Sequence, residues 1–306
     1  MLERGALAAM GTRFEIIVAG ESGSHARASI EAALGEIEHC HKLWNPFSGD
    51  SMVARLHDPM REVVPIDGLT LELLSLCERL KQETGGAFSA TVGSVLASRD
   101  PRREFHEGAE IPEGRSAYEI HDQPPCVRIL HRDVRWDFGA IAKGFALDLA
   151  VEVLRESGVE NAFLHGGSSS VTVLGSAPGL TGWDVQLPHG EVVSLQDGQS
   201  LGVSSDGGNY QGDHLIDPVG GEWVESQSMG CWVRGRSGAE VDAWATALLV
   251  SRNHSRIPMI PGAEGKDWGF FEQPRSDTQS KAVTAEVEVP SSGAESPRDC
   301  GFKTEF

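Results

Sequence analysis

The sequence predicts the α+β class, with helices packed on mixed or antiparallel sheets. Two observations predict this class. Residues 161–175 have the pattern of a strand, a glycine turn and a second strand, and several further short strands follow between residues 181 and 235. Four other segments carry apolar residues at the spacing of amphipathic helices. The chain has 306 residues, enough for one large domain or two closely joined ones.

The first elements follow from hydrophobic periodicity. Residues 13–20 (RFEIIVAG) predict a strand. Residues 24–44 predict a helix, because one face is apolar at Ile30, Ala33, Leu34, Ile37 and Cys40. A second amphipathic helix is expected over residues 69–86, where Gly85 and Gly86 provide the C-terminal stop. Residues 95–125 are polar and predict an irregular surface excursion.

The second half starts with two short strands, CVRIL (126–130) and VRWDF (134–138), before a glycine-containing turn. A helix is expected over residues 143–158, closed by Gly158, and another over residues 238–252. From residue 273 onward, the chain is rich in Ser, Pro and charged residues. We therefore expect one folded domain over residues 1–272 and a disordered tail over residues 273–306.

Charge and cysteine usage exclude several classes of function. The net charge of −19 argues against a broad electrostatic grip on nucleic acid or anionic lipid. A phosphate-bearing ligand would then be held by local amides, a metal ion or a few chosen cations. The five cysteines are scattered without a C-x-x-C pair, which argues against a cysteine zinc site and indicates a reducing compartment. With no signal peptide seen, a cytoplasmic location is expected; a periplasmic or membrane-anchored one is expected if a leader was removed.

The expected helix at 238–252 contains the strongest metal-binding pattern. Asp242 and Thr246 are four residues apart and therefore share one helix face. A carboxylate and a hydroxyl so placed can bind one hard cation, and oxygen ligands suit magnesium or calcium. The spacing alone is more typical of a surface acid beside a half-buried threonine. Asp242 is, however, the only acid in the apolar run VDAWATALLV, and an acid embedded there needs a partner.

Three glycine-containing segments are further candidates. In DFGAIAKG (137–144), Lys143 lies near the start of a helix and can meet phosphate or flavin oxygens, or it is a surface lysine at a strand-to-helix turn. In GDHLIDPVGG (212–221), His214 can be a general base or a phosphate donor, or a structural histidine. The turn HGGSSS (165–170) either admits a ligand or forms a tight hairpin.

The order of these segments resembles the ApbE family of flavin transferases, which attach FMN from FAD to a Thr or Ser of a target protein. The resemblance covers nearly the whole chain before the tail. Its specific parts are residues 137–167 and the Asp-x-x-x-Thr pattern of residues 242–246. The weaker parts are MGTRFEIIV (10–18), GDSMVARLH (49–57), TGGAFSATVG (84–93) and HLIDPVGG (214–221).

The resemblance implies a set of site residues. A magnesium ion would be held by the side chains of Asp242 and Thr246 and the main-chain carbonyl of Ala140. FAD would be contacted by Met10, Phe47, Ala87, Phe88, Ser89, Asp137 and Lys143, and His214 would lie beside the diphosphate. Among these, His214 and Asp242 are the predicted catalytic residues. The resemblance also implies a two-lobed, T-fold-like architecture with the cofactor in the cleft between the lobes.

The implied activity is Mg-dependent transfer of FMN to a Thr or Ser hydroxyl of an acceptor protein, with release of AMP. The chain departs from the family pattern in three places: Ser89 stands where the family has an acid, DPVGG lacks an arginine and a threonine, and Ser168 stands where an acid is common. These departures keep two alternatives open: an FAD-binding carrier without transfer activity, and an FAD diphosphate hydrolase. The partners expected are FAD and an acceptor protein, with no nucleic acid and no transmembrane segment.

Overall fold

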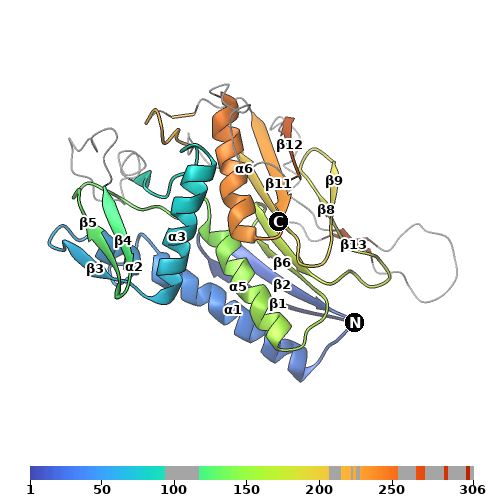
Figure 1. Ribbon diagram of the computed structural model, residues 1–306. Helices are drawn as coiled ribbons and strands as arrows, with labels where there is room; N and C mark the ends of the chain where they lie inside the picture. The colour runs from blue at the N-terminus through green and yellow to red at the C-terminus, as the bar shows by residue number, and fades with distance from the viewer. Residues whose placement is uncertain are drawn as a thin grey trace, which may run out of the picture.

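A computed structural model describes residues 1–93, 117–206, 215–221, 223–224, 228–253, 267–272, 286–288 and 301–303. Its main feature is a seven-stranded sheet in the order β1-β2-β6-β7-β10-β11-β12 (Figure 1). All neighbours in this sheet are antiparallel. The strands are β1 (Leu2–Ala9), β2 (Thr12–Ala19), β6 (Ala162–Gly166), β7 (Ser170–Leu174), β10 (Ser200–Ser205), β11 (Met229–Gly235) and β12 (Asp267–Glu272).

Three long helices cover one face of this sheet: α1 (Ser24–Trp44), α5 (Ala142–Glu156) and α6 (Gly238–Asn253) (Figure 1). The hairpin of β8 (Trp183–Gln186) and β9 (Val192–Leu195) packs on the opposite face. Alternation along the strands supplies both interfaces, because successive side chains point to opposite faces. Ile16 lies in the core under the helices, whereas its neighbour Ile17 and its cross-strand partner Phe163 pack with Trp183 of the hairpin.

The first half of the chain also forms a smaller antiparallel sheet, separate from the large one. It has the order β3-β5-β4, formed by β3 (Val63–Pro65), β5 (Pro125–Ile129) and β4 (Tyr118–Asp122). The helices α2 (Met52–Leu56) and α3 (Gly68–Glu83) lie next to this sheet (Figure 1). Val64 and Val127 of this sheet belong to the same hydrophobic core as the helices on the large sheet. The two sheets therefore share one core, and the two-lobed arrangement stays a prediction.

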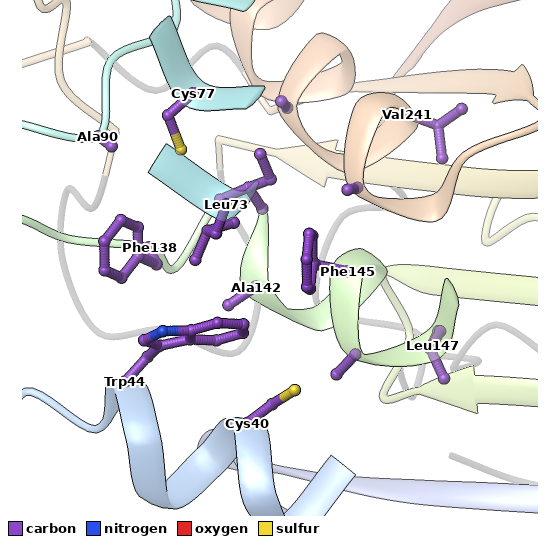
Figure 2. Close-up of a cluster of buried hydrophobic side chains, with 14 of the residues drawn as sticks. Cys40, Trp44, Leu73, Cys77, Ala90, Phe138, Ala142, Phe145, Leu147 and Val241 are labelled. Atoms are coloured by element: carbon purple, nitrogen blue, oxygen red, sulfur yellow. The ribbon is translucent and has the colours of Figure 1, made fainter. Parts of the chain in front are cut away.

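Side chains of α1, α3 and α5 lie together in one part of the shared core (Figure 2). The Trp44 ring at the end of α1 packs edge-on against Phe145 of α5 and Phe138, with ring centroids 5.4 Å and 6.3 Å apart. Its indole nitrogen donates to the hydroxyl oxygen of Thr70 in α3 at 3.1 Å, so the ring is fixed in orientation. Burying a large aromatic side chain of this kind stabilises the fold by roughly 1.5–3 kcal/mol.

The α+β class predicted from the sequence is confirmed, and the four long helices lie where periodicity placed them. Two predictions were wrong. Tyr118–Asp122 forms strand β4 although the polar sequence predicted irregular structure; its residues are mostly exposed, so they carry no apolar alternation. VRWDF is an extended segment with a single bridge, at Arg135, and not a strand.

The tail expected at 273–306 contains two three-residue strands, β13 (Glu286–Glu288) and β14 (Gly301–Lys303), which pair antiparallel. Its other residues lie outside the described part of the chain, so the disordered tail and the domain boundary at residue 272 stay predictions. None of the helices in the described ranges is long and apolar enough to cross a membrane.

Candidate functional site

The N-terminal turns of α5 and α6 meet at two glycines. A Cβ atom added to Gly144 would lie 2.0 Å from the main-chain oxygen of Gly238, and one added to Gly238 would lie 2.7 Å from the main-chain oxygen of Gly144. Only residues without side chains allow the two backbones to come this close. Gly144, the second glycine of GAIAKG, thus lets the start of α6 lie against the start of α5. Asp242 lies one turn further along α6.

Asp242 is a buried carboxylate with a defined orientation. It is 7% exposed, and its Oδ2 accepts hydrogen bonds of 2.8 Å from the backbone N–H of Gly144 and from the hydroxyl of Ser170. Burial raises the pKa of Asp242 to about 7, against the opposing effects of Lys143 and of these two hydrogen bonds. No hydrogen bond to its other oxygen, Oδ1, is found in the described part of the chain.

The other two predicted metal ligands lie on α6 and in the turn before α5. Thr246 is half-buried, and its hydroxyl donates to the main-chain oxygen of Asp242 at 3.3 Å, one turn back along α6. Ala140 is half-buried in the turn that leads into α5. These residues offer a carboxylate, a hydroxyl and a carbonyl, a set that suits a hard cation such as Mg²⁺. Oδ1 of Asp242, which accepts no hydrogen bond from the described residues, fits this role as well.

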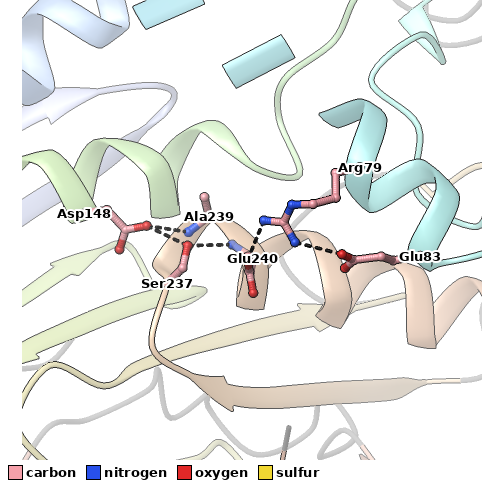
Figure 3. A network of polar contacts seen from close by, with 6 residues as sticks. All are labelled: Arg79, Glu83, Asp148, Ser237, Ala239 and Glu240. Carbon is pink, nitrogen blue, oxygen red and sulfur yellow. Dashed lines mark hydrogen bonds and ion pairs between the residues drawn. The ribbon is translucent and has the colours of Figure 1, made fainter. Parts of the chain in front are cut away.

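Asp148 stabilises the same junction from the other side (Figure 3). Its carboxylate accepts from the backbone N–H groups of Gly238 at 2.7 Å and Ala239 at 3.1 Å, and from the hydroxyl of Ser237 at 2.9 Å. These donors would be unpaired at the start of α6 without a capping group. Burial raises the pKa of Asp148 to about 6, against these hydrogen bonds.

In the described chain, no group of three or more His, Cys, Asp or Glu side chains forms a metal site.

A cavity of about 390 Å³ opens beside this junction. This volume lies within the range typical of ligand sites. The structure brings four predicted cofactor residues together in its lining: Met10, Phe47, Asp137 and Lys143. Aromatic and basic side chains complete the wall; they include Trp44, Trp136, Phe138 and His41.

Two of the lining residues shape the turn itself. Asp137 Oδ1 accepts from the backbone N–H of Gly139 at 2.8 Å, and the Lys143 ammonium donates to the main-chain oxygen of Gly139 at 3.2 Å. The turn is therefore closed by its own charged side chains, while both remain at the cavity wall. This arrangement places one acidic and one basic side chain at the wall of a pocket that also contains the rings of Trp44, Phe47, Trp136 and Phe138.

The segment predicted to contact FAD at Ala87, Phe88 and Ser89 lies close by, but none of its three residues lines this cavity. Ala87 and Phe88 are buried in the core, and the Ser89 hydroxyl lies 2.9 Å from that of Thr91. The main-chain oxygen of Ala90 accepts from the N–H of Asp137, which ties this segment to the turn. His214 lies outside the described residues.

Several site residues were not found from the sequence. Ser170 lies in the HGGSSS turn, which was noted as a possible ligand turn, but its bond to Asp242 joins residues 72 positions apart. Trp44 and Trp136 were interpreted only as parts of a helix and a strand. An apolar ring in an amphipathic pattern predicts burial, and nothing in the pattern shows that the ring also faces a cavity.

Comparison with known proteins decides the family. The sequence profile of the ApbE family matches residues 10–264. The chain belongs to the ApbE family. The family resemblance seen in the sequence is therefore confirmed, and the matched region contains all the predicted site residues.

Curated ApbE relatives carry the name FAD:protein FMN transferase. The chain is 32% identical to the one from Rhodobacter capsulatus, in an alignment that covers 94% of this chain and 60% of the relative. The relative from Treponema pallidum is 23% identical, with coverages of 86% and 83%. The chain thus spans about three fifths of the Rhodobacter relative's length.

Solved ApbE structures share the fold. The ApbE protein from Thermotoga maritima superposes with a TM-score of 0.72 at 22% identity, covering 89% of this chain and 97% of that one. A mutant of the flavin transferase ApbE from Vibrio cholerae gives a TM-score of 0.74 at 18% identity, with coverages of 90% and 95%. At these identities the likeness shows the common fold alone.

Proposed function

We propose that this chain transfers FMN from FAD to a Thr or Ser hydroxyl of an acceptor protein, depends on Mg²⁺ and releases AMP. The observation that carries the proposal is the Asp242 carboxylate, which is buried at the α5–α6 junction beside a cavity lined in part by aromatic rings and Lys143. One of its oxygens is fixed by two hydrogen bonds, and the other accepts none from the residues that the structure describes. Membership of the ApbE family and the names of the curated relatives support the same activity.

The reaction is a phosphoryl transfer. The acceptor hydroxyl oxygen forms a bond to the phosphorus of the FMN half, and the bond from that phosphorus to the bridging oxygen of the diphosphate breaks. AMP leaves with the bridging oxygen, and the hydroxyl proton passes to a base. His214 is the residue predicted for this proton transfer.

Magnesium, when bound, offsets the negative charge that collects on the phosphoryl oxygens. Asp242, Thr246 and Ala140 would hold it. Gly144 and Ser170 would fix Asp242 Oδ2, so that Oδ1 is the atom presented to the cation. The remaining contribution of the chain is positioning, which together with electrostatic stabilisation supplies the rate enhancement in phosphoryl transfer.

The cavity would hold a flat ring system of FAD between aromatic side chains, with Lys143 at the end nearest the α5 turn. A lysine ammonium there supplies a point charge for a phosphate oxygen. Such local recognition agrees with a net charge of −19, because a few cations replace a basic surface.

Incubation of the protein with FAD, Mg²⁺ and a candidate acceptor protein tests the proposal, with products followed by mass spectrometry. Covalent flavin on the acceptor together with AMP is the expected result. Free FMN plus AMP would instead identify a diphosphate hydrolase, and bound but unchanged FAD would identify a carrier. The departures at Ser89, Ser168 and the DPVGG segment are the reason to measure all three outcomes.

Asp242→Ala is the matched variant for this assay. It is expected to abolish both transfer and hydrolysis, while Asp133→Ala, a change in a partly exposed loop aspartate, is expected to retain them. Full activity of Asp242→Ala would contradict the metal assignment. The cytoplasmic location predicted from the sequence is a separate proposal, and fractionation of the source cells tests it.

A further inference from the structure

The segment GDSMVARLH (49–57) has no role in the proposed chemistry, yet it ends in a contact with the cavity wall. The Ser51 hydroxyl accepts from the N–H of Ala54 at 3.0 Å and starts the short helix α2. Three buried residues, Met52, Val53 and Leu56, anchor that helix in the core.

His57 is the C-terminal cap of α2, and its own N–H donates to the main-chain oxygens of Val53 and Arg55. Its backbone is therefore fixed to an anchored helix. The imidazole Nε2 accepts a 2.8 Å hydrogen bond from the backbone N–H of Trp136, 79 residues further along the chain. The two rings also stack, with centroids 6.0 Å apart and planes 20° apart.

Trp136 occupies an extended segment with a neighbour on one side. The segment 90–93 runs beside it: Gly93 donates to the main-chain oxygen of Arg135 at 3.1 Å, and Asp137 donates to that of Ala90 at 2.8 Å. Successive N–H groups of an extended chain point in opposite directions. The Trp136 N–H therefore points away from that neighbour, and the imidazole of His57 supplies the acceptor there.

The consequence concerns the wall of the cavity. Trp136, Asp137, Phe138 and Gly139 are consecutive lining residues, and Trp136 is fully buried. A buried backbone N–H without an acceptor is costly, so loss of the His57 bond favours a shift of this extended segment. Such a shift would move the Asp137 and Gly139 turn that leads into α5.

We propose that His57 is a positioning residue, which holds the 136–139 wall of the cofactor cavity through the backbone N–H of Trp136. The ligand part of this inference rests on the proposed function, since FAD is the ligand assigned to the cavity. Nε2 must be unprotonated in order to accept, so His57 acts as a neutral acceptor and not as an acid or a charge.

Two substitutions of similar length separate the hydrogen bond from packing. His57→Gln keeps an acceptor oxygen at the reach of Nε2, whereas His57→Met has similar bulk without a strong acceptor. We expect the dissociation constant for FAD, measured by quenching of flavin fluorescence, to rise about tenfold in His57→Met and to stay within about threefold of wild type in His57→Gln. His121→Met, at an exposed position on β4, is the control and is expected to bind as wild type.

Amide hydrogen exchange in the ligand-free proteins gives a second readout that needs no FAD. Faster exchange in residues 134–140 is expected in His57→Met and not in His57→Gln. Equal exchange and equal FAD affinity in the two variants would overturn the inference, as would a His57→Met chain that loses its fold altogether. If wild type itself fails to bind FAD, the proposed function is contradicted, and the exchange experiment still decides the role of His57.

Discussion

Asp242 and Asp148 cap each other's helices. Asp242 of α6 accepts from the N–H of Gly144 in the first turn of α5, at 2.8 Å, and Asp148 of α5 accepts from the N–H of Gly238 in the first turn of α6, at 2.7 Å. The two carboxylates are thereby held at the positive ends of two helices, where negative charge is favoured. This exchange of caps fixes the proposed metal ligand by the same contacts that join the helices.

The contact between Gly144 and Gly238 makes a steric prediction. Gly144→Ala places a methyl group 2.0 Å from the main-chain oxygen of Gly238, and a backbone atom cannot rotate away as a side chain does. We expect the free energy of unfolding to fall by about 3 kcal/mol in urea denaturation.

Gly35→Ala is the matched control, because Gly35 lies within α1 and a Cβ atom there meets no atom within 4 Å. It should leave stability unchanged or raise it by about 0.5–1 kcal/mol, since alanine favours helix. Equal stability of the two variants would show that α5 and α6 do not meet at this glycine.

The Ser170 hydroxyl orients the proposed metal ligand. Ser170 is 1% exposed and donates to Asp242 Oδ2 at 2.8 Å. Removal of a hydrogen bond to a ligating carboxylate lowers metal affinity by about 10-fold to 100-fold in other metal sites. Ser170→Ala is therefore expected to weaken Mg²⁺ binding by about tenfold in isothermal titration calorimetry. Ser168→Ala, at an exposed position two residues away, should bind Mg²⁺ as wild type does. Equal Mg²⁺ affinities of the two variants would show that Ser170 does not orient the metal ligand.

The parts of the fold that the sequence predicted are those with a strong local signal. Helix α1 begins and ends where the apolar spacing placed it, because Ile30, Ala33, Ile37 and Cys40 recur at helical spacing and are all buried. Strand β4 was missed because only Tyr118 is buried there, and the partner that orders it, β5, lies beyond a turn. Asp242 became a candidate from the sequence for a similar reason: one acid in an apolar run stands out at any position, and its role as a ligand stays a prediction.

The remaining site residues depend on contacts that no local pattern records. Ser170 meets Asp242 only because β7 lies under α6, and His57 meets Trp136 only because α2 packs beside an extended segment 79 residues away. A serine in a glycine turn and a histidine after a short helix are common in any chain. Their roles follow from tertiary packing and become visible only in the structure.

Lys143 makes a prediction about the cofactor. The ammonium lies at the cavity wall, and its bond to the Gly139 oxygen at 3.2 Å is one that a phosphate oxygen can replace. A hydrogen bond to a charged group contributes about 1.5–3 kcal/mol, so Lys143→Ala is expected to raise the dissociation constant for FAD by about tenfold or more. Lys81→Ala in α3, away from the cavity lining, is the control. Unchanged affinity in Lys143→Ala would make this lysine a surface charge of the helix.

His165 provides a test of pH dependence on the other face of the sheet. It is 1% exposed on β6, and burial lowers the pKa of its imidazole to about 4, with Arg13 acting in the same direction and the Gly167 carbonyl opposing. Nε2 lies 3.8 Å from Oε2 of Glu15. The same oxygen lies 3.5 Å from the Arg13 guanidinium, so the Glu15 charge is shared between Arg13 and the imidazole. The neutral form is therefore the one that the fold accommodates.

The sign of the effect follows from proton uptake. An unfolded histidine has a pKa of about 6.5, so between pH 6.5 and 4 the unfolded chain binds the proton and the folded chain does not. Stability is complete above about pH 6.5 and is lost as the pH falls toward 4, by about 3 kcal/mol from this group. The raised pKa values of Asp148 and Asp242 act in the opposite direction, so the test compares variants and not the wild-type curve alone. The measurement is the free energy of unfolding in urea from pH 4.5 to 7.5. His165→Gln should lose this part of the dependence on pH, and the control His25→Gln, at an exposed position on α1, should keep it. Parallel curves for wild type and His165→Gln would show that the imidazole has the same pKa in the folded and unfolded chains.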